Sequence, residues 1–374
     1  MTDLKTLVEH EMQRAGSPQY SIGDLVETRD RKRRNKRIAA GVVAIAIFAA
    51  PVVLFALHVF DRTQSPASTG IRSTAPTPRP LQVDDSAPVP DAPGVDYVID
   101  LDKNVVTPLP ETILRSVVSA TWRETGRYAV SSDGSRLAFI GTGDDGNPQI
   151  FVARLDGTGV RQVTRDQTGP TSPAWSPDGT TIAYEGNGSA GRHAIFVVDV
   201  ATGETRQVID GGTLGQPTFT PDGSTLLYVG GTNQRPVLRT VPVTGGESTV
   251  LIEPRGGIND VGNGSLSPDG SLVTFMGSGV PDSGEVEHCG PCRFVSNVDG
   301  TGRRVISGWM AIPAGTWSPD GTRIVTEEIV ASNGEVVPSF ILVVDVATGA
   351  GTKVANGRAA IWINDHMLLV EAGP

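Results

Sequence analysis

The chain has 374 residues, including 45 glycines and 27 prolines, and 38% of it is hydrophobic. This length allows one large domain with appendages, and abundant turn-forming residues are typical of an all-β fold. The formal net charge is −10, although residues 1–37 are net basic at +3, with nine basic and six acidic side chains. The acidic remainder argues against nucleic acid or anionic lipid as its partner.

Residues 1–37 form a short tail with helical character. Apolar side chains recur at helical spacing between Leu4 and Met12, and Ser21 with Asp24 resembles a capping box that starts a second short helix. The tail is either a solvated segment beside a membrane or an interaction tail for a cytosolic protein. Its layout, ahead of a basic cluster and a long apolar stretch, resembles that of bacterial membrane proteins that bind sigma factors.

The apolar stretch covers residues 38–60 and has no formally charged side chain. In a helix that rises 1.5 Å per residue, it is long enough to span a hydrocarbon core of roughly 30 Å. Seven basic residues within 29–37 precede it, which predicts a cytoplasmic N-terminus and an extracytoplasmic C-terminal part. The apolar core of a signal peptide usually has only about 7–15 residues. We therefore expect an uncleaved signal-anchor, a single transmembrane helix in the cell membrane, rather than a cleaved signal peptide.

Residues 61–94 are rich in Pro, Ser, Thr and Ala, and include PTPRP and PVPDAP. A segment of this composition does not bury a core, so we expect an extended, semi-rigid linker. It is either a plain spacer or a stalk that lifts the following domain across a cell wall.

The rest of the chain is built from repeats of one fourteen-residue pattern, best seen in PAWSPDGTTIAYEG. The copies start at Tyr128, Pro173, Pro217, Gly264, Gly315 and, in a less regular form, Ala360. Their aligned aspartates are Asp133, Asp178, Asp222, Asp269, Asp320 and Asp365, which are 44 to 51 residues apart. Self-similarity at such a period indicates a solenoid or a propeller.

Each copy describes a β-hairpin. In its Ser-Pro-Asp-Gly turn, Pro presets φ, Asp bonds its own backbone and Gly takes a positive φ. A second recurrent unit, again a strand, a Gly-containing turn and a strand, starts at Ile150, Ile195, Val237, Phe294 and Ile341. Four strands in each period of about 45 residues is the pattern of a β-propeller blade.

The number of units predicts how the ring closes. There are six hairpins of the first kind, five units of the second kind lie between them, and a sixth unit, DYVIDLDKNVVTPLP, stands alone from Asp96. We therefore expect this front unit to supply the two outer strands of the last blade, in a two-plus-two clasp without open sheet edges. The predicted fold is all-β. Residues 95–374 form a six-bladed β-propeller with four-stranded blades, preceded by a single transmembrane α-helix and a short helical cytoplasmic tail.

The pattern W/F-S-P-D-G-x-x-[IL]-[AV]-[YF], followed by units such as IFVVDVATGE, resembles the WD40-like (PD40) repeat of TolB-type six-bladed propellers. The resemblance covers residues 95–374. Propellers of this kind serve as docking platforms, as periplasmic complex subunits and as gating domains of peptidases, so the resemblance implies a fold more than a function. TolB itself has an α/β domain before its propeller, whereas here we expect a membrane anchor, so the partners of TolB are not carried over.

Two repeated features suggest a site but have a simpler explanation. The aligned aspartates suggest a metal or catalytic centre, but Asp-Gly in a turn that follows Pro is required by turn geometry, so we interpret them as turn residues. Trp175, Phe219 and Trp317 share one position of the repeat. We interpret them as packing residues between blades, and the alternative is an aromatic platform for a ligand.

The longest insertion reads GSGVPDSGEVEHCGPC over residues 277–292 and contains the only two cysteines, Cys289 and Cys292. It also carries Glu285, Glu287 and His288. Outside the cytoplasm a cysteine pair most often forms a disulfide, which we predict here. The alternative is a zinc or copper site, although structural zinc normally takes two well-separated ligand pairs. Cys-Gly-Pro-Cys also matches the thioredoxin active site, but that chemistry needs a helix N-terminus, and we expect this sequence between strands.

Loops on a rigid scaffold commonly carry function, so the polar residues of the other loops are candidates as well. They are Asp144 and Asp145 in 141–148, Arg192 and His193 in 186–193, and Arg235 in 230–236. With Glu285, Glu287 and His288, they are the predicted binding residues on the rim of the propeller, near the mouth of its channel.

The sequence has no G-x-S-x-G nucleophile elbow, no H-E-x-x-H and no phosphate-binding Gly-Lys-Ser/Thr. We predict a non-enzymatic protein without a cofactor, whose extracytoplasmic propeller binds an envelope protein or a glycan as a scaffold or sensor. One alternative is transmembrane signalling, in which the tail binds a cytosolic regulator such as a sigma factor. Another is an envelope hydrolase or lyase with its site at the channel mouth.

Overall fold

The computed structural model describes residues 83–84, 95–117, 127–188, 192–211, 215–232, 235–255, 257–279, 289–307, 316–328, 331–332, 335–336, 340–357 and 359–372. The predicted tail and membrane helix, residues 1–60, lie outside these ranges, so both stay predictions. Within the ranges, the structure has no helix that is long and apolar enough to cross a membrane.

The first three blades follow one another along the chain, and each is a four-stranded antiparallel sheet. Blade 1 consists of β4 (Tyr128–Val130), β5 (Arg136–Thr142), β6 (Pro148–Arg154) and β7 (Arg161–Gln162). Blade 2 consists of β8 (Thr171–Trp175), β9 (Thr181–Asn187), β10 (His193–Asp199) and β11 (Thr205–Asp210). Blade 3 consists of β12 (Thr218–Phe219), β13 (Thr225–Thr232), β14 (Arg235–Pro242) and β15 (Thr249–Ile252).

The last three blades complete the set, with additions in blade 5. Blade 4 consists of β16 (Gly262–Leu266), β17 (Leu272–Gly279), β18 (Cys289–Asn297) and β19 (Arg304–Ser307). Blade 5 consists of β20 (Thr316–Trp317), β21 (Arg323–Glu328), β24 (Phe340–Asp345) and β25 (Gly351–Asn356), and the hairpin of β22 (Ala331–Ser332) and β23 (Glu335–Val336) lies between β21 and β24. Blade 6 consists of β26 (Ala359–Asn364), β27 (Met367–Glu371), β2 (Tyr97–Asp100) and β3 (Val105–Pro108).

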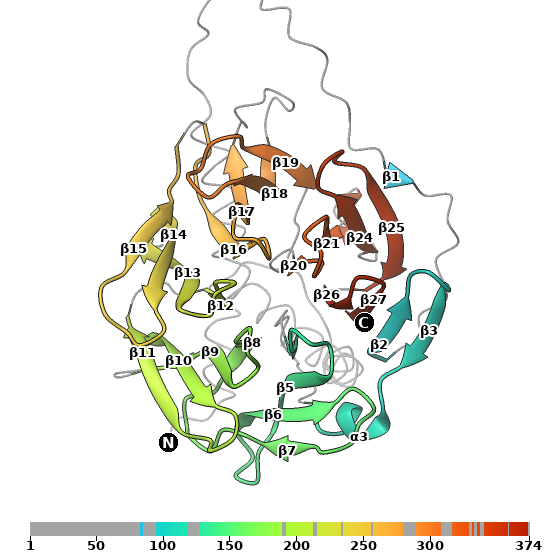
Figure 1. Cartoon of the computed structure of the whole chain (residues 1–374), viewed down its shortest axis with the longest axis vertical. Helices are drawn as coiled ribbons and strands as arrows, with labels where there is room; N and C mark the ends of the chain where they lie inside the picture. Colours follow the sequence, from blue (N-terminus) through green and yellow to red (C-terminus); the bar gives the residue numbers. More distant parts are fainter. Residues whose placement is uncertain are drawn as a thin grey trace, which may run out of the picture. The chain divides into compact units, whose positions relative to one another are not determined.

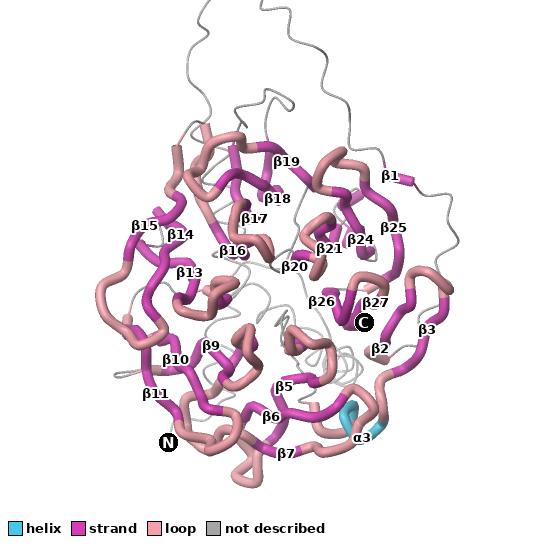
Figure 2. The backbone as a smooth tube through the Cα atoms, viewed as in Figure 1, coloured by secondary structure: helices cyan, strands magenta, loops and turns pink. Residues whose placement is uncertain are grey.

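The six sheets stand around a ring with their first strands on the inside (Figures 1 and 2). Going round, β4, β8, β12, β16, β20 and β26 each contact the next first strand, and β26 contacts β4. A cluster of buried apolar side chains lies between each pair of neighbouring blades, so each interface contains a small core. The predicted six-bladed propeller with four-stranded blades is confirmed.

Blade 6 confirms the predicted clasp, since its strand order is β26-β27-β2-β3. The C-terminal β27 pairs with the N-terminal β2, in a register that places Tyr97 opposite Val370 and Asp100 opposite Met367. The hydroxyl of Tyr97 also donates a hydrogen bond of 2.8 Å to the carbonyl oxygen of Asn356 in blade 5. The two ends of the domain are therefore joined within one sheet.

Two elements were not expected from the sequence. Strand β1 (Val83–Asp84), within the segment expected to be only a linker, pairs in parallel with the outer edge of blade 5, Val83 opposite Gly351 and Asp84 opposite Thr352. The short helix α3 (Glu111–Leu114) follows β3 and buries Ile113. Both elements lie on the outside of the ring (Figure 1).

The repeated aspartates are turn residues, as predicted. The carboxylate of Asp133 accepts hydrogen bonds from the Ser131 hydroxyl at 2.6 Å and from the backbone N–H of Ser135 at 3.1 Å. The following residue, Gly134, has a φ of 69°. The same arrangement recurs at Asp178, Asp222, Asp269 and Asp320. The side chain therefore satisfies backbone donors of its own turn.

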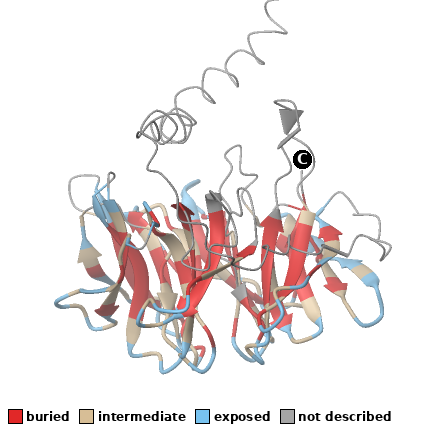
Figure 3. Ribbon diagram, turned by 90° about the horizontal axis from the view of Figure 1, so that it is seen from above, coloured by how far each residue is buried: buried red, intermediate tan, exposed pale blue. Residues whose placement is uncertain are grey.

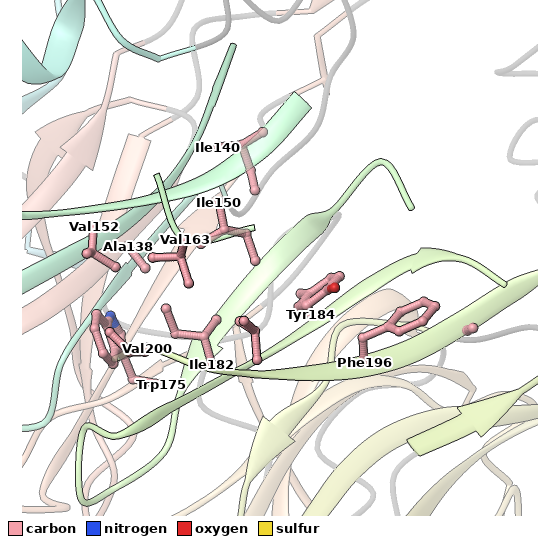
Figure 4. Packing of buried hydrophobic residues seen from close by; sticks show 12 residues of the cluster. Ala138, Ile140, Ile150, Val152, Val163, Trp175, Ile182, Tyr184, Phe196 and Val200 are labelled. Carbon is pink, nitrogen blue, oxygen red and sulfur yellow. The ribbon is translucent and has the colours of Figure 1, made fainter. Parts of the chain in front are cut away.

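The aromatic residues of the repeat pack between blades, again as predicted. Trp175 belongs to a buried cluster with residues of blades 1 and 2, among them Ile182 and Val200 (Figure 4). Its indole Nε1 donates a hydrogen bond of 3.1 Å to the carbonyl oxygen of Ala129 in blade 1. Trp317 does the same from blade 5, donating to the carbonyl oxygen of Ser265 in blade 4 at 3.1 Å. Phe219 packs against a cluster formed by blades 2 and 3.

The turn aspartates predict how stability depends on pH. Hydrogen bonds from Ser131 and Ser135 lower the pKa of Asp133 from 3.8 to about 2, and those from Ser267 and Ser271 do the same for Asp269. A carboxylate whose pKa is lower in the folded state stabilises that state above about pH 4, and this contribution is lost as the pH falls towards 2. We expect the melting temperature of the full chain, followed by circular dichroism, to fall over this window.

The double variant Asp133→Asn, Asp269→Asn should show a shallower fall in melting temperature between pH 4 and pH 2. Asp144→Asn, outside these turns, controls for the loss of a negative charge. An unchanged slope in the double variant would contradict the role given to the turns.

Candidate functional site

The two faces of the ring differ in their connections. The turns between first and second strands and between third and fourth strands lie on one face, which we term the turn face. The second strands end and the third strands begin at the other face, which we term the loop face, and the residues between them in the sequence are 143–147, 188–192, 233–234, 280–288 and 329–339. Figure 3 shows the ring edge-on, with buried residues in the middle of the strands and exposed residues at the connections. The predicted binding residues that the structure describes, Asp144, Asp145, Arg192, His193 and Arg235, lie at the loop face.

Asp144 and Asp145 are exposed in the loop of blade 1. The carboxylate of Asp145 accepts hydrogen bonds from the backbone N–H of Asn147 at 3.1 Å and from its side-chain amide at 2.8 Å. The Asn147 hydrogen bonds lower the pKa of Asp145. Asp145 thus shapes its own loop.

Arg192 and His193 lie at the start of β10 in blade 2, and each is near an acidic side chain of the same blade. The guanidinium of Arg192 is 3.5 Å from the carboxylate of Asp210, and Nδ1 of His193 is 2.7 Å from the carboxylate of Glu185. Both basic side chains are more than half exposed, at 62% and 63%. Blade 2 therefore presents a charged, hydrogen-bonding rim.

Arg235 is exposed at the start of β14 in blade 3, where its backbone N–H donates a hydrogen bond of 3.2 Å to the hydroxyl of Thr232. Glu285, Glu287 and His288 lie outside the described residues. The predicted rim residues that are described thus stand on three successive blades. In the described part of the chain, no group of three or more His, Cys, Asp or Glu side chains is placed to hold a metal ion.

The cysteine sequence belongs to blade 4. The expectation that Cys-Gly-Pro-Cys lies between strands is wrong, because β18 begins at Cys289 and pairs it with Gly279 in β17. The register places Cys292 opposite Gly277. Cys292 is buried and disulfide-bonded, and Cys289 is the only other cysteine in the sequence.

A buried charged network, which sequence reasoning missed, lies where blade 6 meets blade 1. The guanidinium of Arg127 is 3.2 Å from the carboxylate of Asp96 and 3.1 Å from that of Glu371. Asp96 also accepts hydrogen bonds from the Tyr128 hydroxyl at 2.6 Å and from the Ala372 N–H at 2.9 Å. These residues come from the start of β2, the start of β4 and the end of β27, so the network ties together three distant segments.

The electrostatics of this network follow from its burial. The Asp96 and Glu371 side chains are only 10% and 7% exposed. Burial raises the pKa of the Glu371 carboxyl, and the charge of Arg127 opposes that rise. Burial, together with the neighbouring charge of Asp96, raises the pKa of the Tyr128 hydroxyl. The one available signal in the sequence was an acidic residue, Glu371, at the end of a strand expected to be buried.

We expect the substitution Arg127→Met to lower the free energy of unfolding by about 3 kcal/mol, because it leaves two carboxylates buried without their cation. Adding Glu371→Gln should recover part of the loss, since the amide carries no charge. Urea denaturation of the full chain measures both. Arg115→Met is the control, because Arg115 forms an ion pair with Glu111 in which the side chains are 77% and 73% exposed. If Arg127→Met lowered the free energy of unfolding no more than Arg115→Met does, the network would not have the proposed role in joining blades 6 and 1.

Comparisons with known proteins agree with this architecture. The family model of the TolB β-propeller domain (PD40) matches residues 101–284. No curated protein matches the chain. Its structure is similar to that of a protein from Agrobacterium tumefaciens described as a TolB, at 17% identity and a TM-score of 0.54, covering 75% of this chain and 98% of that one.

TolB from Acinetobacter baumannii is similar at 14% identity and a TM-score of 0.50, covering 74% of this chain. The match spans 63% of the A. baumannii protein. At these identities the likeness to both structures concerns the fold. Together with the repeats and the closed ring, the family match identifies this chain as one that carries a TolB-type (PD40) six-bladed β-propeller.

Proposed function

We propose that the propeller is a non-enzymatic platform that binds an envelope protein or glycan through its loop face. The observation that carries the proposal is the contrast between the two faces. On the turn face the connections between first and second strands are tight and repeat the same Asp-Gly geometry in blades 1 to 5. On the loop face they differ in length and sequence, from residues 233–234 to residues 329–339. Variation confined to one face of a rigid scaffold is typical of a recognition surface.

The chemistry of the described loop face supports this proposal. Asp144, Asp145, Arg192, His193 and Arg235 are exposed and of mixed charge. Exposed side chains with both signs of charge suit hydrogen bonding to a protein surface or to sugar hydroxyls. The scaffold beneath them is fixed by the inter-blade cores and by the clasp, so partner binding need not order the blades themselves.

The proposed setting is the outer side of the cell membrane. Residues 38–60 are the proposed anchor, and residues 29–37 orient it with the tail in the cytoplasm. A platform held in this way meets envelope components rather than cytosolic ones. The tail then either only orients the protein or transmits binding to a cytosolic regulator.

Site-specific photo-crosslinking in cells tests the proposed binding face. A benzophenone amino acid at Asp145 or Arg235 on the loop face should capture a discrete partner. The same probe at Ala201, exposed on the turn face of blade 2, should not. Equal capture from both faces, or capture from the turn face alone, would rule out the loop face as the binding surface. Repeating the experiment without residues 2–28 should leave capture unchanged, whereas its loss would show that the tail is needed.

Membrane topology is tested separately. The full chain should stay in the membrane pellet after alkaline carbonate extraction, and added protease should digest the propeller in cells whose outer layers have been made permeable. Deletion of residues 38–60 should release the protein to the soluble fraction. A full chain that is extracted by carbonate would exclude the proposed anchor.

A further inference from the structure

An arginine in the outer strand of one blade repeatedly contacts the next blade. The guanidinium of Arg206 in β11 donates a hydrogen bond of 2.7 Å to the carbonyl oxygen of Val243 in blade 3. Arg161 in β7 donates to Val200 in blade 2, and Arg304 in β19 donates to Val346 in blade 5. Three of the six interfaces thus have the same bridge at the same height, near the turn face.

The strand register shows that these arginines are equivalent. Arg161, Arg206 and Arg304 lie opposite Val152, Val197 and Val295 of their own third strands. In the next blade, the acceptor carbonyl belongs to the residue three positions after the valine or threonine that holds the same third-strand position. In blade 2, for example, the acceptor is Val200, three positions after Val197. The bridge is therefore a feature of the repeat.

At the interface between blades 5 and 6, a threonine holds the arginine's place. Thr352 in β25 lies opposite Val343, which matches Val197 and Val295 in the register. In blade 6 the matching third-strand residue is Val98, opposite Leu369, so the acceptor position falls on Leu101. The side chain of Thr352 is too short to bridge this distance, since an arginine side chain spans the gap elsewhere.

The remaining two interfaces also have threonine at this position but fill the space in other ways. Between blades 3 and 4, where Thr249 holds the place, Arg303 reaches back from blade 4 and donates a hydrogen bond of 2.6 Å to the carbonyl oxygen of Arg255. Between blades 6 and 1, the hydroxyl of Thr112 in α3 donates a hydrogen bond of 3.0 Å to the carbonyl oxygen of Gly157 in blade 1.

Between blades 5 and 6 the structure instead has an open pocket of about 510 Å³. This volume lies within the range of about 300–1,000 Å³ that is usual for ligand sites. Both residues of the incomplete bridge, Thr352 and Leu101, line it, and Val343 and Ile99 form its apolar floor. The pocket has room for the side chain that the other interfaces supply themselves.

The pocket is lined by two cationic and two carboxylate side chains, and the carboxylates can pair with a cationic occupant. The two cationic side chains of the pocket lie against aromatic rings. Nζ of Lys353 is 4.8 Å from the centre of the Phe340 ring, and Cζ of Arg323 is 4.9 Å from the centre of the Trp362 ring. Two carboxylates also line the pocket. One oxygen of Asp345 already accepts hydrogen bonds of 2.7 Å from the backbone N–H and the hydroxyl of Thr348, whereas the Asp102 side chain is 67% exposed and lies 3.0 Å from Nδ1 of His366. Carboxylates and a main-chain carbonyl are the partners that a guanidinium group binds with charge-assisted hydrogen bonds.

We propose that this inter-blade pocket binds the guanidinium group of an arginine side chain from a partner polypeptide, in place of the internal arginine found between blades 1 and 2, 2 and 3, and 4 and 5. The site lies on the side of the ring, near the turn face. It therefore goes beyond the proposed loop-face function and does not depend on it. The recognised feature is an exposed arginine whose planar head group reaches between two blades.

Saturation-transfer NMR with the full chain tests the proposal. The probe is the peptide acetyl-Gly-Arg-Gly-amide, and the comparison peptide carries citrulline in place of arginine. The arginine peptide should bind saturably, and the citrulline peptide should bind roughly tenfold more weakly, because its urea group has the same shape but no charge. Equal binding of the two peptides would overturn the proposal.

Two variants and one control variant locate the binding. Thr352→Arg supplies the missing bridge from within, so it should abolish peptide binding and raise the melting temperature, whereas Thr249→Arg at the equivalent position of blade 3 should leave binding unchanged. Asp102→Asn, at a side chain that is 67% exposed, should weaken binding about threefold. Binding that survives in both Thr352→Arg and Asp102→Asn would show that the pocket is not the site.

Discussion

The whole ring depends on the joint at which its two ends meet. In every other blade the four propeller strands come from one continuous stretch of chain, but blade 6 needs both ends of the domain, β2 and β3 from one and β26 and β27 from the other. Next to this joint, Arg127 holds Asp96 and Glu371 in a network shielded from water. Buried charges of this kind add little net stability, but they tolerate few alternative partners. The network therefore favours one pairing of the ends over others.

The remaining interfaces repeat a common design with small variations. An aromatic residue such as Trp175 seals the inner part of an interface, and an arginine such as Arg206 ties the outer part. Because each blade contacts only its two neighbours, a substitution at one interface changes that interface and leaves the others intact. Thr352 is a local difference of this kind, and a pocket lies there in place of the arginine bridge found at three other interfaces.

Much of the fold could be predicted from the sequence because its causes are local and repeated. The Asp-Gly turns, the position of Trp175 and the unpaired front unit from Asp96 are visible as aligned residues, and a period of about 45 residues admits few architectures. The arginines were visible too, as the aligned R in GVRQV, ETRQV and GRRVI, but their target is a carbonyl on another blade that no local pattern specifies.

The candidate site was harder to predict for the same reason. The sequence identified loop residues such as Asp145 and Arg235, but their distances depend on how the blades are placed around the ring. The Arg127 network joins residues up to 276 positions apart, as between Asp96 and Ala372. Strand β1 pairs only two residues, and its apolar pattern is too short to distinguish it from a linker. Long-range contacts of this kind follow from topology rather than from periodicity.

The two-plus-two clasp also sets the order in which the chain can fold. Strands β2 and β3 leave the ribosome first among the blade strands, yet their partner β27 ends at Glu371, close to the last residue of the sequence. The first four blades and the four propeller strands of blade 5 can form while the chain is still being made, but closure must wait until β27 has been synthesised, so the entropy cost of closing this long loop comes last. Until then β2 keeps an unpaired edge that any extended segment can join. A chain stalled before β27 would thus display an open sheet edge, which makes the pairing of β27 with β2 the step that commits the domain to its closed ring.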